Sequence, residues 1–127
     1  MTKQARSEIR AHWTRVAALG CIVTGGPAEI AHCHGGSMRD LGYTKTRGKK
    51  QPWMDWLVLP LAPEYHRWRP DALDVSVERF ELKYGKQVDW LDTICAALGV
   101  DVWKRMRNDH PDAWMPREEP KDHRRHP

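Results

Sequence analysis

The sequence predicts a small single-domain α+β protein. Its 127 residues are enough for one domain with a modest core. Two kinds of pattern occur along the chain: short apolar runs ended by Gly or Pro, which are typical of strands, and longer segments with apolar residues at helical spacing. Together these patterns predict a core of short strands between an N-terminal helix and C-terminal helices.

A helix is predicted over residues 5–19. Ile9, Trp13 and Val16 fall at i, i+4 and i+7, which places them on one face, and Gly20 is a natural stop. We therefore assign residues 1–20 to an N-terminal helix.

Strands and turns are predicted next. The short apolar runs 21–23 and 29–32 flank Gly25-Gly26-Pro27, which predicts a small hairpin. Residues 35–52 are rich in Gly, Lys and Arg and have no apolar period, so we expect a long loop there.

A second apolar segment, residues 56–61, is too short for an independent helix. We expect a strand or a buried extended segment, followed from about Pro63 by a helix that carries Tyr65 and His66. We assign residues 21–85 to the core of the domain.

The C-terminal part predicts two more helices. One carries Val77, Phe80 and Tyr84 on one face and ends at Gly85. The other begins at Asp89 as its N-cap and ends at Gly99. Its apolar face consists of Trp90, Leu91, Ile94 and Leu98. We place a helix that packs on the core within residues 86–105, and we expect 106–127, a segment rich in Pro and mixed charge, to be a flexible tail.

Charge is distributed unevenly along the chain, whose formal net charge is +4. Residues 36–69 contain seven Lys and Arg against three acidic residues, and residues 70–103 contain three against seven. This distribution favours one surface that binds phosphates.

The cysteines and the hydropathy indicate the compartment. Cys21, Cys33 and Cys95 are odd in number and lack paired spacing, which favours a reducing compartment over a disulfide framework. The sequence has no apolar run of membrane-spanning length, so we expect no membrane partner and a cytoplasmic location.

Several side chains suited to chemistry lie at or after the ends of the predicted strands. His32 and His34 are i, i+2 and would point to the same side of a strand, with Cys33 buried on the other side. Asp55 and His66 flank the second apolar segment, and Asp74 follows one short loop later.

This combination suits phosphodiester hydrolysis. A neutral imidazole, with a reference pKa of about 6.5, can take a proton from water near neutral pH. A divalent cation held by imidazole and carboxylate can orient a phosphate and neutralise charge on the leaving oxygen. A basic loop can hold the polyanion through its backbone phosphates.

The order of these pieces resembles the HNH (ββα-metal) nucleases, and most closely the phage and prophage recombination-enhancement (Ref) nucleases. The matching pieces are HWTRVAALGC (12–21), PAEIAH (27–32), the Gly/Lys loop, Asp55, LPLAPEYHR (59–67) and RFELKYG (79–85). They span residues 12–85, about three-fifths of the chain.

The resemblance implies a small ββα-metal core that cuts DNA around one divalent cation. His32 matches the general base and Asp55 the middle position that orients the base or supports the metal loop. His66 matches a metal ligand, and Asp74 falls where relatives often carry another ligand. His34 is a rival to His32 for the base and a further candidate ligand. An Asp/His site suits Mg²⁺ or Mn²⁺.

The chain departs from the family pattern in three places. Relatives often carry Cys pairs that hold a structural zinc, but these four positions are Cys21, Thr24, Ala62 and Tyr65 here. We therefore expect no structural zinc. We expect the lost stability to come instead from the packing of Trp53, Trp56, Tyr65 and Trp68.

The other departures are Ala31, where many relatives have a His beside the base, and Asp74 in place of His. They leave a second function open: a DNA-binding or recombination accessory protein that keeps the fold without cleavage.

The expected partner is DNA. Six basic residues are candidates for contact with it: Lys45, Arg47, Lys49, Lys50, Arg67 and Arg69. The resemblance also implies a phage or prophage origin and a bacterial cytoplasmic setting, and it permits a recombinase on single-stranded DNA as a further partner.

Overall fold

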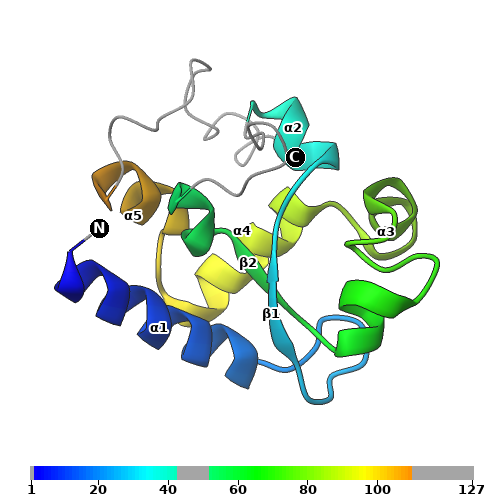
Figure 1. The fold of residues 1–127 in the computed structure, drawn as a ribbon, viewed down its shortest axis with the longest axis horizontal. Coiled ribbons are helices and arrows are strands. Elements are labelled where there is room, and N and C mark those ends of the chain that lie inside the picture. Colours follow the sequence, from blue (N-terminus) through cyan, green and yellow to red (C-terminus); the bar gives the residue numbers. More distant parts are fainter. Residues whose placement is uncertain (1, 43–51, 110–127) are drawn as a thin grey trace.

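A computed structural model describes residues 2–42 and 52–109. Within them the fold is α+β: helices surround an antiparallel sheet of two strands, β1 (Glu29–His32) and β2 (Val58–Leu61). Figure 1 shows the two strands side by side at the centre, with α1 (Lys3–Ala18) along one side and α3 (Val77–Tyr84) on the other. None of the described helices has the length and apolar content that a bilayer crossing needs.

The predicted helices form, with small differences at their ends. In α1, Ile9 and Val16 are buried as the spacing predicts, and Thr2 caps the helix by accepting from the backbone N–H of Ala5. The helix α4 (Gln87–Leu98) ends at Gly99, which adopts the left-handed conformation. Its N-cap is Lys86 rather than the predicted Asp89, which lies in the first turn.

The strand pairing differs from the prediction. The segment 21–23 is not a strand: Cys21 accepts from the backbone N–H of Gly25 and donates its own to Gly26, which closes a tight turn. β1 pairs instead with β2, with Glu29 opposite Leu61 and His32 opposite Val58. The predicted hairpin is therefore wrong: the backbone groups of Cys21 are used within the turn, and the Ile22 N–H donates to Pro60 of β2 and not to β1.

The second apolar segment forms a turn and then a strand. A 3₁₀ turn, η1 (Pro52–Trp56), precedes β2, so Trp56 lies in the turn and not in the strand. A π-helical turn, η2 (Glu64–Trp68), follows β2 and carries His66, as predicted.

Two predicted irregular segments contain helix. Residues 36–40 of the expected loop form α2 (Gly36–Asp40). The expected tail begins later than predicted, because α5 (Val102–Asp109) buries Val102, Trp103 and Met106. Residues 43–51 and 110–127 lie outside the described part of the chain.

Two clusters of buried side chains hold these elements together. The larger cluster joins α1, η1, β2, α4 and α5, and it contains Trp56 and Trp103. The smaller cluster consists of Cys21, Ala31, Leu61, Leu73 and Phe80. The sheet contributes to both clusters, so the ends of its strands are held on more than one side.

Candidate active site

The first group of candidate residues lies where β1 ends. His32 pairs with Val58, so η1, which precedes β2, is brought beside the end of β1. His32 Nε2 and Asp55 Oδ1 are 3.0 Å apart. An ionised carboxylate only accepts hydrogen bonds, so Nε2 of His32 is the donor. The structure thus brings together the two residues predicted as base and orienting group.

The helix α1 supports this pair. The indole N–H of Trp13 donates to the backbone oxygen of Asp55 at 2.8 Å, and the Trp13 ring meets the His32 ring edge-on, with 5.8 Å between centroids. The side chains of His32 and Asp55 keep 27% and 16% of their exposure, so solvent reaches both.

A surface pocket of about 370 Å³ adjoins Asp55. Its other lining residues come from α1: Arg6, Ile9, Arg10 and Trp13. Two arginines thus line a space next to the histidine–carboxylate pair.

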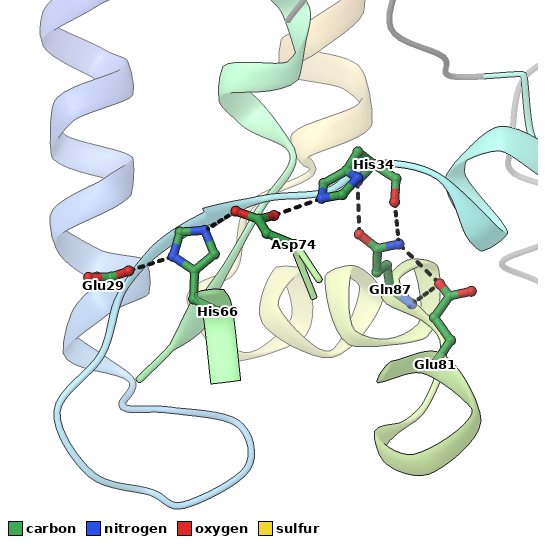
Figure 2. A network of polar contacts seen from close by, with 6 residues as sticks. All are labelled: Glu29, His34, His66, Asp74, Glu81 and Gln87. Carbon is green, nitrogen blue, oxygen red and sulfur yellow. Dashed lines mark hydrogen bonds and ion pairs between the residues drawn. The ribbon is translucent and has the colours of Figure 1, made fainter. Parts of the chain in front are cut away.

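The second group is a chain of alternating carboxylates and imidazoles, drawn in Figure 2. His34 Nε2 lies 2.8 Å from Asp74 Oδ1, and His66 Nε2 lies 3.0 Å from Asp74 Oδ2. On its other side, His66 Nδ1 lies 2.5 Å from Glu29 Oε2. Asp74 therefore joins the two imidazoles that the sequence proposed as metal ligands.

Backbone hydrogen bonds explain why Asp74 reaches His66. The backbone N–H groups of Leu73 and Asp74 donate to the carbonyls of Tyr65 and His66, each at 2.9 Å. The loop before α3 is thus laid along η2. Glu29 reaches the same place because it opens β1 opposite Leu61, and η2 begins directly after β2.

The chain of carboxylates and imidazoles shifts the pKa of its members. Burial disfavours a charge on His66, but hydrogen bonds to Asp74 and Glu29 outweigh burial and raise the pKa of His66. Burial also opposes ionisation of Asp74, yet the hydrogen bonds from His34 and His66 hold the pKa of Asp74 well below its usual range. The arrangement favours a carboxylate at Asp74 beside an imidazolium at His66.

His32 and His34 do not act as a matched pair on one strand. β1 ends at His32, so the alternation of side chains does not extend to His34. The two imidazoles contact different carboxylates, Asp55 and Asp74. Cys33 between them is buried, as predicted, and burial raises the pKa of its thiol.

Three residues of this region were not assigned a site role from the sequence. Glu29 holds the outer nitrogen of His66, while Glu81 and Gln87 contact the segment around His34. A Glu at the start of a strand and a Gln at the start of a helix are common on surfaces, so their identity alone gives no signal.

The described arginines among the predicted DNA contacts are both bound to carboxylates. Arg67 Nη2 lies 3.0 Å from Glu29 Oε1, and Arg69 Nε lies 3.0 Å from Asp71 Oδ1. Arg69 also stacks over the ring of Tyr65. The other four, Lys45, Arg47, Lys49 and Lys50, lie outside the described residues.

The four positions that the sequence resemblance compares with zinc-binding Cys pairs lie near one another. Cys21 belongs to the smaller cluster, Ala62 and Tyr65 pack against it, and the Thr24 side chain lies by the Cys21 thiol. The predicted aromatic packing is only partly correct. Tyr65 contributes, but Trp56 packs in the larger cluster and Trp68 is 69% exposed, since it ends a short surface turn. The side chain of Trp53 lies outside the described part.

The atoms around Asp74 are of types that bind a divalent cation, but here they form hydrogen bonds with one another. Two imidazole nitrogens and a carboxylate are donors that Mn²⁺ accepts, and Glu29 orients His66 as outer carboxylates orient metal-binding histidines. Among the described residues, however, no group of three or more His, Cys, Asp and Glu is arranged around a common point. A cation at these atoms would take the place of ring protons that now bridge to Asp74.

Comparison of the chain with models of protein families, with curated proteins and with solved structures found no match. The class of protein rests on the fold and the site alone: a small α+β protein with two histidine–carboxylate groups beside a two-stranded sheet. One group, His32 and Asp55, lies where β1 ends, and the other runs from Glu29 at the start of β1 through His66 and Asp74 to His34.

Proposed function

We propose that this protein is a metal-dependent DNA endonuclease of the HNH type, in which His32 activates water. The observation that carries the proposal is the hydrogen bond between His32 and Asp55, two residues 23 positions apart. The resemblance in the sequence assigned these residues to the base and its orienting group. Their contact, with solvent access to both, supports that assignment.

Asp55 orients the His32 ring. Because Nε2–H donates to the carboxylate, the neutral ring carries its lone pair on Nδ1. In the proposed step His32 accepts a proton from water as the water oxygen bonds to phosphorus, and the P–O bond to the leaving strand breaks. Asp55 would hold the ring in place and stabilise the imidazolium that forms.

The residues that would hold the cation are His34, His66 and Asp74. A bound Mg²⁺ or Mn²⁺ supplies positive charge to the phosphate oxygens and to the leaving oxygen. His34 follows His32 by two residues, so their Cα atoms are at most about 7 Å apart. In this proposal, one phosphodiester lies between the base and these ligands.

The pocket beside Asp55 suits the DNA backbone. Arg10 lines it, and within the described residues the Arg10 guanidinium has no ion pair, in contrast to Arg67 and Arg69. A phosphate in this pocket would contact Arg10 without first breaking an existing pair. DNA contacts on α1 would then add to those expected from the basic segment 36–69.

A second candidate function is DNA binding without cleavage, as a recombination accessory protein. The observation that favours it is Ala31, which is buried beside His32 where many HNH relatives place a ligand. The hydrogen bonds from His34 and His66 to Asp74 also hold the candidate ligands together without a cation.

Cleavage assays separate the two functions. Supercoiled plasmid and single-stranded DNA would be incubated with the protein in Mg²⁺, Mn²⁺ or EDTA. We expect metal-dependent nicking that His32→Ala lowers about 10²- to 10⁴-fold, the usual contribution of a general base. DNA binding, measured by fluorescence anisotropy, should remain close to that of the wild type.

The matched control is Glu78→Gln, which removes an exposed charge on α3 without touching His32. It should cut as the wild type does. Salt-sensitive DNA binding without any cutting would favour the accessory protein. Cutting by His32→Ala at the wild-type rate would contradict the proposed base.

A further inference from the structure

The segment that carries His34 is a glycine turn pressed against α3. Gly35 and Gly36 both have positive φ, +63° and +45°. A Cβ built on Gly36 would lie 2.3 Å from Glu81 Oε1 and 2.7 Å from Val77 Cγ1. The backbone here approaches α3 so closely that a side chain at position 36 has no room.

Gln87 binds both backbone groups of His34, as Figure 2 shows. The His34 N–H donates to Gln87 Oε1, and Gln87 Nε2 donates to the His34 carbonyl, each at 2.9 Å. Gln87 is 0% exposed, so neither bond competes with bulk water. One side chain from the first turn of α4 thereby fixes the main chain at His34.

Glu81 fixes the orientation of the Gln87 amide. Its Oε2 accepts the backbone N–H of Gln87 at 2.9 Å and lies 3.2 Å from Gln87 Nε2. A carboxylate can only accept, so the NH₂ end of the amide must face Glu81 and the oxygen must face the His34 N–H. The reverse orientation would set an oxygen against the carboxylate and leave the His34 N–H without its acceptor.

Ser37 completes the support from the other side. Its backbone N–H donates to Glu81 Oε1 at 2.9 Å, and its hydroxyl donates to Glu81 Oε2 at 2.5 Å. Glu81 thus binds the residues on both sides of the turn, Ser37 after His34 and Gln87 across from it. The imidazole of His34 reaches Asp74 from a backbone that α3 and α4 hold.

We infer that Gln87 is a positioning residue that sets the place of the His34 imidazole on Asp74. The effect of Gln87 on cation binding rests on the proposed function. The effect of Gln87 on the position of the His34 ring does not. A role confined to joining α4 to the glycine turn would stabilise the fold but leave the His34 ring where it is. The two roles therefore differ in what happens to His34 when Gln87 is replaced.

The test replaces Gln87 in the full chain by Met, which keeps the length of the side chain and removes both hydrogen bonds. In the metal-free protein, we expect the ¹H–¹⁵N signals of the His34 ring to shift and broaden, while those of the His66 ring change little. Titration with Mn²⁺, followed by electron paramagnetic resonance, should give an affinity about 10- to 100-fold weaker than the wild type.

The control is Leu91→Ala, which removes a buried side chain from the same helix one turn later. It should lower the melting temperature but leave the His34 signals and the Mn²⁺ affinity unchanged. If Gln87→Met does not fold, Glu81→Gln tests the same inference, because Glu81 orients the Gln87 amide that binds His34. It should shift the His34 signals in the same direction by a smaller amount.

The inference is overturned if the His34 ring signals of Gln87→Met match those of Leu91→Ala. A wild-type protein that binds no Mn²⁺ would overturn the proposed metal site instead. The metal-free spectra alone would then decide whether Gln87 positions His34.

Discussion

His12 and His66 carry the same side chain in opposite surroundings. His12 lies in α1, 1% exposed, against the ring of Trp56, with 5.2 Å between centroids. Within the described structure, neither of its ring nitrogens has a hydrogen-bond partner. His66 lies on η2 with a carboxylate at each ring nitrogen, Glu29 on one side and Asp74 on the other.

The surroundings drive the two pKa values apart. Burial, reinforced by Arg15 and Arg105, lowers the pKa of His12 to about 4, while a backbone group of Trp56 offsets part of this effect. At His66 the two carboxylates outweigh burial and raise the pKa. His12 thus behaves as a core residue that stays neutral, whereas the surroundings of His66 favour its positively charged form.

The largest effect is expected for His12→Leu. The unfolded chain takes up a proton at His12 below about pH 6.5, but the folded chain does so only near pH 4, so acidification favours unfolding. Between pH 7 and pH 5, this difference should cost the wild type about 2 kcal/mol of unfolding free energy. His12→Leu should lose far less over that range, as measured by urea denaturation at both pH values.

The arginines around His12 provide a check on this explanation. Arg15→Gln removes a nearby positive charge and keeps the burial, so it should reduce the loss on acidification only slightly. Equal losses for the wild type and His12→Leu would show that other groups cause the acid sensitivity.

A smaller effect is expected for Asp74→Asn. The raised pKa of His66 stabilises the fold below about pH 6.5, and this contribution is lost as pH rises through the folded-state pKa. Asp74→Asn should lower the pKa of His66 toward its ordinary value. It should cost about 1–2 kcal/mol at pH 6 and less at pH 9, a range that allows for the 42% exposure of the Asp74 side chain.

The measurement combines urea denaturation at pH 6 and pH 9 with an NMR titration of the His66 ring. An unchanged His66 titration in Asp74→Asn would contradict the assignment of Asp74 as its main partner.

The smallest effect is expected for Glu29→Gln, which weakens one bond to His66 and the pair with Arg67. Because Asp74 contributes more to the raised pKa of His66, Glu29→Gln should lower that pKa less than Asp74→Asn does. The stability should fall by under about 1 kcal/mol. The matched control is Glu64→Gln, which lies on η2 with His66 and should leave the His66 titration unchanged.

Much of the helical structure could be predicted because helical spacing is a local property. Val77, Phe80 and Tyr84 marked α3, and Gly85 marked its end, as the structure shows. The pairing of β1 could not be read in the same way. Each strand has four residues, and the choice between residues 21–23 and β2 as partner depends on contacts far apart in the chain.

The candidate site, too, could be predicted only in part. The sequence, through the order of its motifs, assigned His32, Asp55, His66 and Asp74, and the structure brings them into two contacting groups. The sequence did not assign Glu29 or Gln87 to the site. Glu29 binds a ring nitrogen of His66 and Gln87 binds the backbone of His34, and neither contact produces a recognisable spacing or motif in the sequence.

The spacing of these contacts has a consequence for the order in which the protein is made. Asp55 comes 23 residues after His32, Asp74 comes 40 after His34, and Gln87 comes 53 after His34. The entropy cost of closing such loops must be met before their contacts can stabilise the fold. These pairs therefore form late relative to the helices. A growing chain that has not yet released α4 from the ribosome holds every histidine of the site but lacks Gln87, which binds the main chain at His34. The hydrogen bonds that fix the backbone of His34 are thus among the last contacts of the site that synthesis makes possible.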